Sequence, residues 1–390
     1  MTIEDRLRAQ LRKVAGNVLP PAFAWDEIQN GVTKTGPTSS ARWRLLTILL
    51  ALAISAGAFA GLWLAFRPPT HVQHQVSGPT VPSPSLAATI DVGGPPSAIT
   101  AGTDGVWVLV GADGGASHVE LVRIDPSSNQ VDQRLAIPSS ATSLVDGAGS
   151  LWVTAGSAGT DTMLLRIDPA TGSTIASIPV DGEVRTAGAG AIWAVGASRH
   201  GSSAIVKIDP DTNHVAAIAV PTTATAVAVD GDSVWVLESD ASGNAVGPSE
   251  LLRIDPQTNQ ITATIPVDAS AGLLAAGGGS VWLERPDSMA IRVDEKTGTI
   301  EGSPIPIAGG FAPIGARADG VWFIGSNITD VKTQGGMLLV SHLNPATNSV
   351  DGWVDIPAGI AWKNPPSASI DPTGVIWIAG VSKSVTRVNP

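Results

Sequence analysis

A glutamate and an arginine stand two residues apart, at Glu183 and Arg185. Residues i and i+2 of a β-strand share one face, so this carboxylate and guanidinium can form an ion pair. When the repeats described below are aligned on their tryptophans, no position equivalent to Arg185 carries another charge. These positions are Ile99, Ser143, Val227, Leu274, Ile314 and Ala368. A charge in such surroundings is costly unless it is paired. We therefore expect a Glu183–Arg185 pair at the mouth of a channel, which either binds a ligand or serves as a purely structural ion pair.

Six further candidate ligand-binding residues lie in segments whose length and chemistry differ from repeat to repeat. They are Arg199, His200, Glu238, Glu284, Arg285 and Trp362. Variable loops on a rigid scaffold are where proteins usually bind their partners. Because carboxylates can also hold a metal ion, the arrangement of Glu183, Glu238 and Glu284 separates two functions. A cluster of the three around one metal would favour a lyase or hydrolase, whereas dispersed carboxylates would favour binding.

Several other kinds of chemistry have no candidate residues in this sequence. With no cysteine among 390 residues, there is no disulfide, thiolate zinc ligand or thiol nucleophile. No Ser-His-Asp arrangement, phosphate-binding glycine loop or histidine-rich metal motif is present. We expect no cofactor. The formal net charge of −11 argues against nucleic acid as a partner, because phosphate binding needs a basic surface.

Two sequence markers recur after residue 85 and indicate an internal repeat. The first is a tryptophan in an apolar segment, at Trp107, Trp152, Trp193, Trp235, Trp282, Trp322 and Trp377. The second is a turn that begins with Asp or Asn, at Asp125, Asp168, Asp209, Asp255, Asp294, Asn344 and Asn389. Around both markers apolar and polar residues alternate over about four to eight residues, which is typical of β-strands.

Each repeat of about 40–50 residues contains four such strands, which is the size of one blade of a β-propeller. In the last turn of each repeat, proline presets the backbone angle, and asparagine or glycine accepts the left-handed conformation that follows. The seventh repeat ends before its fourth strand, and residues 86–92 resemble the missing strand. We therefore predict an all-β, seven-bladed propeller that a strand from its N-terminal end closes.

Two rings of repeated side chains have a structural explanation. The tryptophans could bind carbohydrate, but one per blade at a fixed position favours packing between blades. A basic residue or histidine also recurs two residues before each Asp or Asn of the turn. These residues are Arg123, Arg166, Lys207, Arg253, Arg292, His342 and Arg387. The ring could bind a polyanion, but its strict repetition favours pairing with carboxylates of neighbouring strands or blades.

The Gly-x-Leu/Val-Trp-Val strand and the Leu-Leu-Arg-Ile-Asp-Pro-x-Thr-Asn/Gly turn resemble the repeats of two bacterial propeller families, over about residues 85–390. These families are the YVTN/YncE-like propellers and the virginiamycin B lyase-like propellers. The resemblance implies the fold rather than an activity, since one fold hosts many functions. The lyase family uses a histidine and glutamates with a magnesium ion at one mouth of its channel. Residues 234–238 are similar to its Trp-Phe-Thr-Glu strand, but no His-x-Glu pairing accompanies them, so no catalytic residue is carried over.

An uncharged stretch of 22 residues covers positions 45–66. At about 1.5 Å per residue it is long enough to cross the core of a bilayer as a helix. The basic residues before it, Lys34, Arg42 and Arg44, predict a cytoplasmic N-terminus and an extracytoplasmic C-terminal part. The alternative is a cleaved signal peptide, since residues 58–60 resemble a small-residue cleavage site.

The sequence therefore predicts four parts. They are a cytoplasmic tail with short helices over 1–44, a transmembrane signal-anchor helix over 45–66, a proline-rich stalk over 67–84 and the propeller over 85–390. The charge divides in the same way: residues 1–67 carry 8 Lys/Arg against 4 Asp/Glu, and residues 68–390 carry 15 against 30.

We expect a single-pass protein of the cell membrane whose propeller lies outside the cytoplasm. Its variable-loop face, which carries the loops after the tryptophan strands and the loops between blades, would bind a protein or a small envelope ligand without catalysis. The Asp-Gly and Asp-Pro turns are uniform and share the opposite face. The alternative is a lyase or hydrolase with a metal at the channel mouth.

Overall fold

The computed structural model describes ten stretches of the chain, which together contain 28 β-strands. The described residues are 84–111, 118–156, 162–196, 203–239, 249–267, 271–307, 310–327, 337–357, 367–380 and 382–390. The predicted tail and anchor, and the stalk up to residue 83, lie outside them. Within the described stretches, no helix has the length and apolar character needed to cross a membrane.

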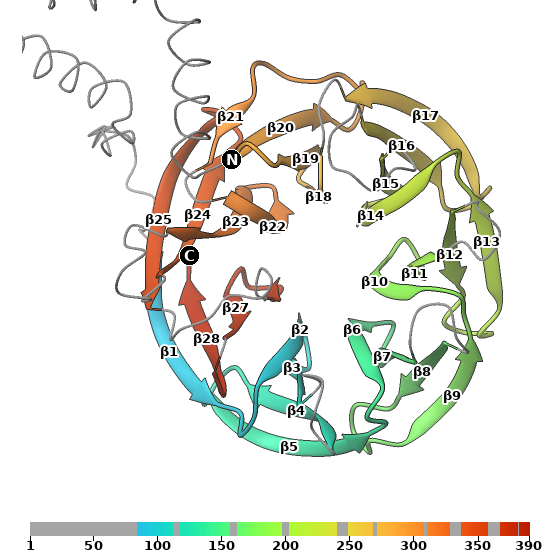
Figure 1. The fold of residues 1–390 in the computed structure, drawn as a ribbon, viewed down its shortest axis with the longest axis vertical. Helices are drawn as coiled ribbons and strands as arrows, with labels where there is room; N and C mark the ends of the chain where they lie inside the picture. The colour runs from blue at the N-terminus through green and yellow to red at the C-terminus, as the bar shows by residue number, and fades with distance from the viewer. Residues whose placement is uncertain are drawn as a thin grey trace, which may run out of the picture. The chain divides into compact units, whose positions relative to one another are not determined.

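The described strands form seven antiparallel sheets of four strands each, arranged as blades around a ring (Figure 1). Blade 1 contains β2 (Pro96–Gly102), β3 (Gly105–Val110), β4 (Val119–Asp125) and β5 (Gln130–Ile137). Blade 2 contains β6 (Ala141–Gly147), β7 (Ser150–Ala155), β8 (Met163–Ile167) and β9 (Thr174–Pro179). Blade 3 contains β10 (Glu183–Gly188), β11 (Ala191–Gly196), β12 (Ala204–Ile208) and β13 (Val215–Ala219).

The remaining blades follow the same order. Blade 4 contains β14 (Thr223–Asp230), β15 (Ser233–Ser239), β16 (Ser249–Asp255) and β17 (Gln260–Val267). Blade 5 contains β18 (Leu273–Gly277), β19 (Ser280–Arg285), β20 (Met289–Asp294) and β21 (Ile305–Pro306). Blade 6 contains β22 (Gly310–Arg317), β23 (Gly320–Asn327), β24 (Met337–Asn344) and β25 (Ser349–Pro357). Blade 7 contains β26 (Ala368–Ile370), β27 (Ile376–Ala379), β28 (Ser384–Asn389) and β1 (Ser85–Asp91).

The two ends of the propeller meet in blade 7, as the sequence predicts. Strand β1 pairs antiparallel with β28, from Ser85 opposite Asn389 to Asp91 opposite Ser384. Figure 1 shows this pair as a blue strand beside a red one. Because the first and last strands share one sheet, the ring closes, and the blades leave only short, protected sheet edges.

The apolar core is divided among the boundaries between blades. Seven clusters of buried residues each combine side chains of two neighbouring blades. Trp107 of blade 1 packs with Leu144 and Leu151 of blade 2, and Trp377 of blade 7 packs with Ile99 of blade 1. All seven repeat tryptophans are buried, with at most 4% of their surface exposed. The prediction of tryptophans as packing elements between blades is therefore confirmed.

In the turns between the third and fourth strands, an asparagine or glycine has the predicted left-handed backbone conformation. Asn129, Asn213 and Asn259 have φ of 56°, 59° and 58°, and Gly172 and Gly298 have φ of 72° and 68°. Asparagine and glycine tolerate this region better than other residues do. The residue type at this one turn position therefore reflects the backbone conformation directly.

The ring of basic residues bridges blades, but mostly through partners other than carboxylates. Five of the seven stack on the tryptophan of their own blade, at 5.3 to 5.8 Å from the ring centre. The same cations donate hydrogen bonds to a turn carbonyl of the next blade, as Lys207 does to Pro256 (2.5 Å) and Arg387 to Pro126 (2.8 Å). Arg123 and His342 are the exceptions, since their carboxylate partners, Asp132 and Asp351, lie in the neighbouring strand of their own blade. The structural interpretation is supported. The expected carboxylate partners are present for Arg123, Arg292 and His342, whereas the other four bind carbonyl oxygens of the next blade.

The strand order also separates the two faces of the ring. In each antiparallel sheet, the loop from the second to the third strand and the loop to the next blade leave from the same end. That end is the variable-loop face. Most of its loops lie outside the described residues, but the strand ends that carry them are described.

Candidate functional site

The candidate residues that the structure describes all lie at strand ends on the variable-loop face. Glu183 and Arg185 are at the start of β10, Glu238 is near the end of β15, and Glu284 and Arg285 end β19. They therefore belong to blades 3, 4 and 5. Three other candidates, Arg199, His200 and Trp362, lie outside the described residues.

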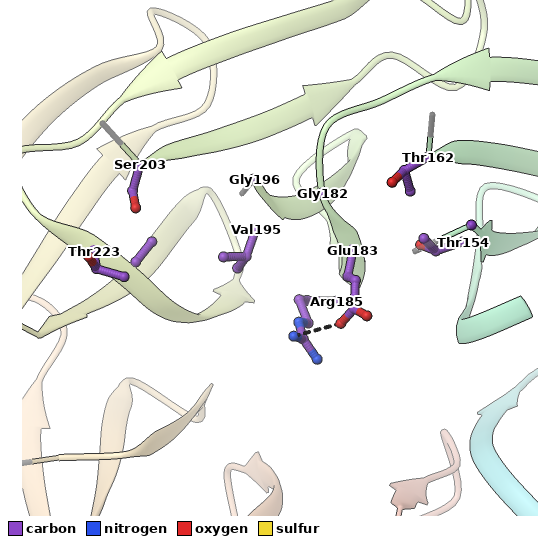
Figure 2. Close-up of a pocket in the computed structure, with 11 residues that line it drawn as sticks. Thr154, Thr162, Gly182, Glu183, Arg185, Val195, Gly196, Ser203 and Thr223 are labelled. Atoms are coloured by element: carbon purple, nitrogen blue, oxygen red, sulfur yellow. Dashed lines mark ion pairs between the residues drawn. The ribbon is translucent and has the colours of Figure 1, made fainter. Parts of the chain in front are cut away.

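A cavity of about 440 Å³ opens on this face at the ends of blades 2, 3 and 4. Figure 2 shows its lining side chains, with Glu183 and Arg185 extending from β10. The lining residues are Thr154, Gly156, Thr162, Gly182, Glu183, Arg185, Val195, Gly196, Ser203, Thr223 and Ala224. The two leading candidate residues are thus part of the wall of this cavity.

The Glu183–Arg185 ion pair predicted from the sequence is present. Nη2 of Arg185 lies 2.9 Å from Oε2 of Glu183 (Figure 2). However, the side chains keep 48% and 38% of their surfaces exposed, respectively. Arg185 is therefore solvated rather than held in an apolar ring, and such an exposed pair contributes little to stability.

A β-bulge places Arg185. Val184 pairs with Ala194 and Thr186 pairs with Trp193, so Arg185 is an extra residue without a partner in the ladder. In blades 1, 2 and 4 the extra residue stands three positions before the residue that pairs with the tryptophan. In β10 it directly precedes that residue, an arrangement that β22 of blade 6 shares at Ile314. Bulges re-aim side chains next to functional sites.

The neighbouring blade holds this bulge in position. The backbone N–H of Val184 donates a hydrogen bond of 3.0 Å to Oγ1 of Thr154, at the end of β7 in blade 2. Thr154 is fully buried. Val184 directly precedes Arg185 in β10. The hydrogen bond from Val184 to Thr154 therefore also orients the Glu183–Arg185 ion pair.

The register corrects one detail of the sequence alignment. Ile99 pairs with Val108, and Leu144 pairs with Val153, so Leu144 rather than Ser143 is the equivalent of Ile99. The first hairpin of blade 2 has no extra residue. Ser143 instead pairs with Thr154.

Gly182 and Gly196 allow segments of main chain in the cavity wall to approach each other closely. A Cβ atom on Gly182 would lie 2.4 Å from the carbonyl oxygen of Val195. A Cβ on Gly196 would lie 2.9 Å from the carbonyl oxygens of both Asp181 and Ala204. Any side chain at these positions would force backbone to move, so this part of the wall consists of main chain.

Glu238 is completely buried beside the start of β14. Its Oε1 accepts a hydrogen bond of 2.8 Å from the backbone N–H of Thr222. Its Oε2 has no hydrogen-bond partner in the described part of the chain. Burial raises the pKa of Glu238 above its usual range, although the bond from Thr222 opposes the shift.

Glu284 and Arg285 have separate environments although they are adjacent. Glu284 is 7% exposed, and burial, with a smaller contribution from the charge of Asp287, raises its pKa to about 7. Arg285 forms an ion pair with Asp287 at 2.8 Å. A carboxyl group with a pKa near neutrality can transfer protons. Burial alone also raises the pKa of a carboxyl group that has only a structural role.

The three glutamates do not form a metal centre in the described part of the protein. They lie on blades 3, 4 and 5, and no group of three or more His, Asp or Glu side chains among the described residues is placed to hold an ion. A cluster of the three glutamates around one metal would favour a lyase or hydrolase, and dispersed carboxylates would favour binding. In the described residues the three glutamates are dispersed.

The hydroxyl groups of the cavity were not among the residues predicted from the sequence. Thr154, Thr162, Ser203 and Thr223 contribute hydroxyl side chains to its wall. Thr154 was detectable, because the equivalent position two residues after the tryptophan is Leu109, Val195, Leu237 or Ile324 in four other blades. Serine and threonine are otherwise too common in this chain for their positions to mark a site.

Comparison with known proteins identifies the fold. The structure of streptogramin B lyase has a TM-score of 0.55 and 16% sequence identity, with 79% of this chain and 98% of that chain covered. The WD40 β-propeller domain of Doa1 has a TM-score of 0.53 and 13% identity over 79% and 98%. A chain of the mitotic checkpoint complex has a TM-score of 0.56 and 13% identity over 82% and 98%.

The likeness is one of fold. At these identities, and with 1095 solved chains matching, the similarity does not select one activity. No family model and no curated protein matches the sequence. The seven-bladed propeller and its structural likeness to a streptogramin B lyase agree with the resemblance seen in the repeats, whereas the YVTN/YncE-like resemblance stays a prediction.

Proposed function

We propose that this protein is a membrane-anchored, extracytoplasmic binding protein without enzymatic activity. Its propeller binds a protein or a small envelope ligand at the variable-loop face. The observation that carries the proposal is the cavity of about 440 Å³ at the ends of blades 2, 3 and 4, which includes Glu183 and Arg185.

The position of the cavity supports a binding role. Its lining residues flank two loops of the variable-loop face, those after β7 and β11. The strands around it are fixed by the packing of tryptophans between blades and by hydrogen bonds such as that from Val184 to Thr154. A rigid scaffold with variable loops at one end is a common arrangement for recognition.

The membrane part of the proposal rests on the sequence. The uncharged stretch over residues 45–66 and the basic residues before it support an anchor with a cytoplasmic N-terminus. The acidic balance of residues 68–390 supports a partner other than nucleic acid. The described carboxylates Glu183, Glu238 and Glu284 lie on three different blades, which is the arrangement expected of a binding role.

Crosslinking of the full-length protein in its own membrane tests this proposal. We expect a specific partner to be captured by the parent protein and lost when Arg185 and Arg285 are changed to Ala. The matched control is Arg134→Ala, which removes a guanidinium of similar exposure, 42% against 48%, from an ion pair in blade 1.

Two results would contradict the proposal. Capture that is equal in the parent and the double variant would place the binding surface elsewhere. Failure to capture any partner, combined with no binding of small ligands to the purified full chain, would exclude a binding role for this face.

A further inference from the structure

The polar wall of the cavity contains one acid and one base whose charged groups touch. Glu183 and Arg185 are its charged lining residues, with 2.9 Å between Oε2 and Nη2. The other polar side chains of the lining are the hydroxyls of Thr154, Thr162, Ser203 and Thr223. The formal charge of the lining is therefore zero, but its charge is separated over a few ångströms.

We propose that this cavity binds a small zwitterion of the α-amino acid type, with its ammonium on Glu183 and its carboxylate on Arg185. The inference rests on the proposed function and names the ligand class of the same site. An α-amino acid carries its ammonium and its carboxylate on the same α-carbon. Its nitrogen and carboxylate oxygens are therefore about as far apart as the atoms of a hydrogen-bonded ion pair, so both groups can face the Glu183–Arg185 pair together.

Charge complementarity disfavours ligands with a single charge. An anion on Arg185 would face the carboxylate of Glu183 at short range, and a cation on Glu183 would face the guanidinium of Arg185. A zwitterion satisfies both side chains without leaving a like-charge contact. Guanidinium also offers two parallel N–H donors, the geometry that a carboxylate accepts best.

The exposure of the ion pair makes it available to a ligand. Side chains that keep 48% and 38% of their surfaces exposed are already solvated, so a ligand replaces water rather than breaking a buried contact. The backbone below them is held by the bond from Val184 to Thr154 and by the close approach of Gly182 and Gly196 to neighbouring main chain. Such preorganisation reduces the entropy lost on binding.

The size and walls of the cavity suit a small polar molecule. A volume of about 440 Å³ lies in the lower part of the range for small-molecule sites. Its described lining contains no aromatic side chain, so a sugar or a flat heterocycle finds no ring to stack on. The exposed hydroxyl of Thr223 can hydrogen-bond a polar side chain of the ligand.

Isothermal titration of the purified full-length chain with defined probes tests the inference. The zwitterionic probes are glycine, L-alanine and L-glutamine. The single-charge probes are alanine amide, which lacks the carboxylate, and N-acetylalanine, which lacks the ammonium. We expect at least one zwitterion to bind, and its single-charge analogues to bind about tenfold more weakly or worse.

Charge-removing variants locate the binding. Glu183→Gln and Arg185→Gln should each weaken zwitterion binding by about tenfold or more, since each removes a charge-assisted hydrogen bond. The matched controls are Glu120→Gln and Arg134→Gln. Glu120 and Arg134 form an ion pair of similar exposure, 40% and 42%, with 3.1 Å between Oε2 and Nη1. This pair lies outside the cavity lining, so these two substitutions should leave the affinity for zwitterions unchanged.

The inference is overturned if no zwitterion binds, if single-charge analogues bind equally well, or if the Glu183 and Arg185 variants keep the parent affinity. This failure differs from failure of the proposed function. If zwitterions do not bind but the Arg185 and Arg285 variant still loses a crosslinked partner, the face is a binding site for another ligand and only the zwitterion is excluded.

Discussion

At the scale of single residues, the main chemical feature outside the ion pair is a buried acid. Glu284 is 7% exposed at the end of β19, and burial raises its pKa to about 7. The unfolded chain would ionise this group near pH 4.5, whereas the folded protein keeps it protonated up to about pH 7. Between these values the folded state binds more protons than the unfolded state, so stability falls as the pH rises.

We predict that Glu284→Gln stabilises the protein at pH 8 and has little effect at pH 4.5. Glutamine resembles the protonated acid but has no charge to bury, so the gain at pH 8 is up to about 3 kcal/mol. Denaturant unfolding of parent and variant at the two pH values measures it. An equal effect of the substitution at both pH values would show that Glu284 does not titrate between them in the folded protein.

At the scale of elements, the decisive feature is the bulge of β10. It is set by a hydrogen bond from Val184 to Thr154 of the neighbouring blade, and it places Arg185 on the cavity wall. A similar bond joins blades 1 and 2, where Thr100 accepts from the N–H of Asp146 at 3.2 Å. The bond of Thr100 lies outside the cavity lining. Comparing the two bonds therefore separates an effect on protein stability from an effect on the geometry of the cavity.

We predict that Thr154→Val and Thr100→Val both destabilise the protein, by about 1–3 kcal/mol, because each leaves a backbone N–H without its acceptor. Only Thr154→Val should also weaken ligand binding at the cavity, since only this change loosens the backbone beside Arg185. Chemical denaturation and titration of both variants test the prediction. Equal loss of binding in the two variants would mean that the bulge is not oriented by Thr154.

At the scale of the whole molecule, one strand from the beginning of the propeller completes its last blade. Strand β1 pairs with β28, and Ile90 and Val92 are buried with 7% and 0% of their surfaces exposed. Arg387 adds a second connection across the closure, through its 2.8 Å bonds to Pro126 and Asn129 of blade 1. The closure therefore depends on both hydrogen bonding along a strand and contact between the first and last blades.

We predict that deleting residues 85–91 lowers the Tm by roughly 10 °C or more, because it removes a strand and exposes the edge of β28. A synthetic peptide of residues 84–92 should bind the deleted protein and restore part of the loss. Deletion of seven residues within the 68–83 segment is the control. Thermal unfolding that is unchanged by removing β1 would show that the ring does not need this strand.

Part of the candidate site could be predicted and part could not. The Glu183–Arg185 pair was predictable because its residues are two positions apart in one strand, where local geometry brings side chains together. The hydroxyls that complete the cavity come from blades 2, 3 and 4. Their approach depends on how blades pack, which no local pattern encodes. Arg199, His200 and Trp362 lie outside the described residues and stay predictions.

The number of blades, the strands within them, the left-handed turn residues and the closure of the ring could all be predicted from the amino-acid sequence. These features are local, and the chain repeats their signals seven times. The partners of the basic ring, the bulge at Arg185 and the cavity beside it depend on how the blades pack. These contacts join residues about 30 to 50 positions apart, as in Thr154 with Val184 and Lys207 with Pro256. They exist only once neighbouring blades have packed against each other.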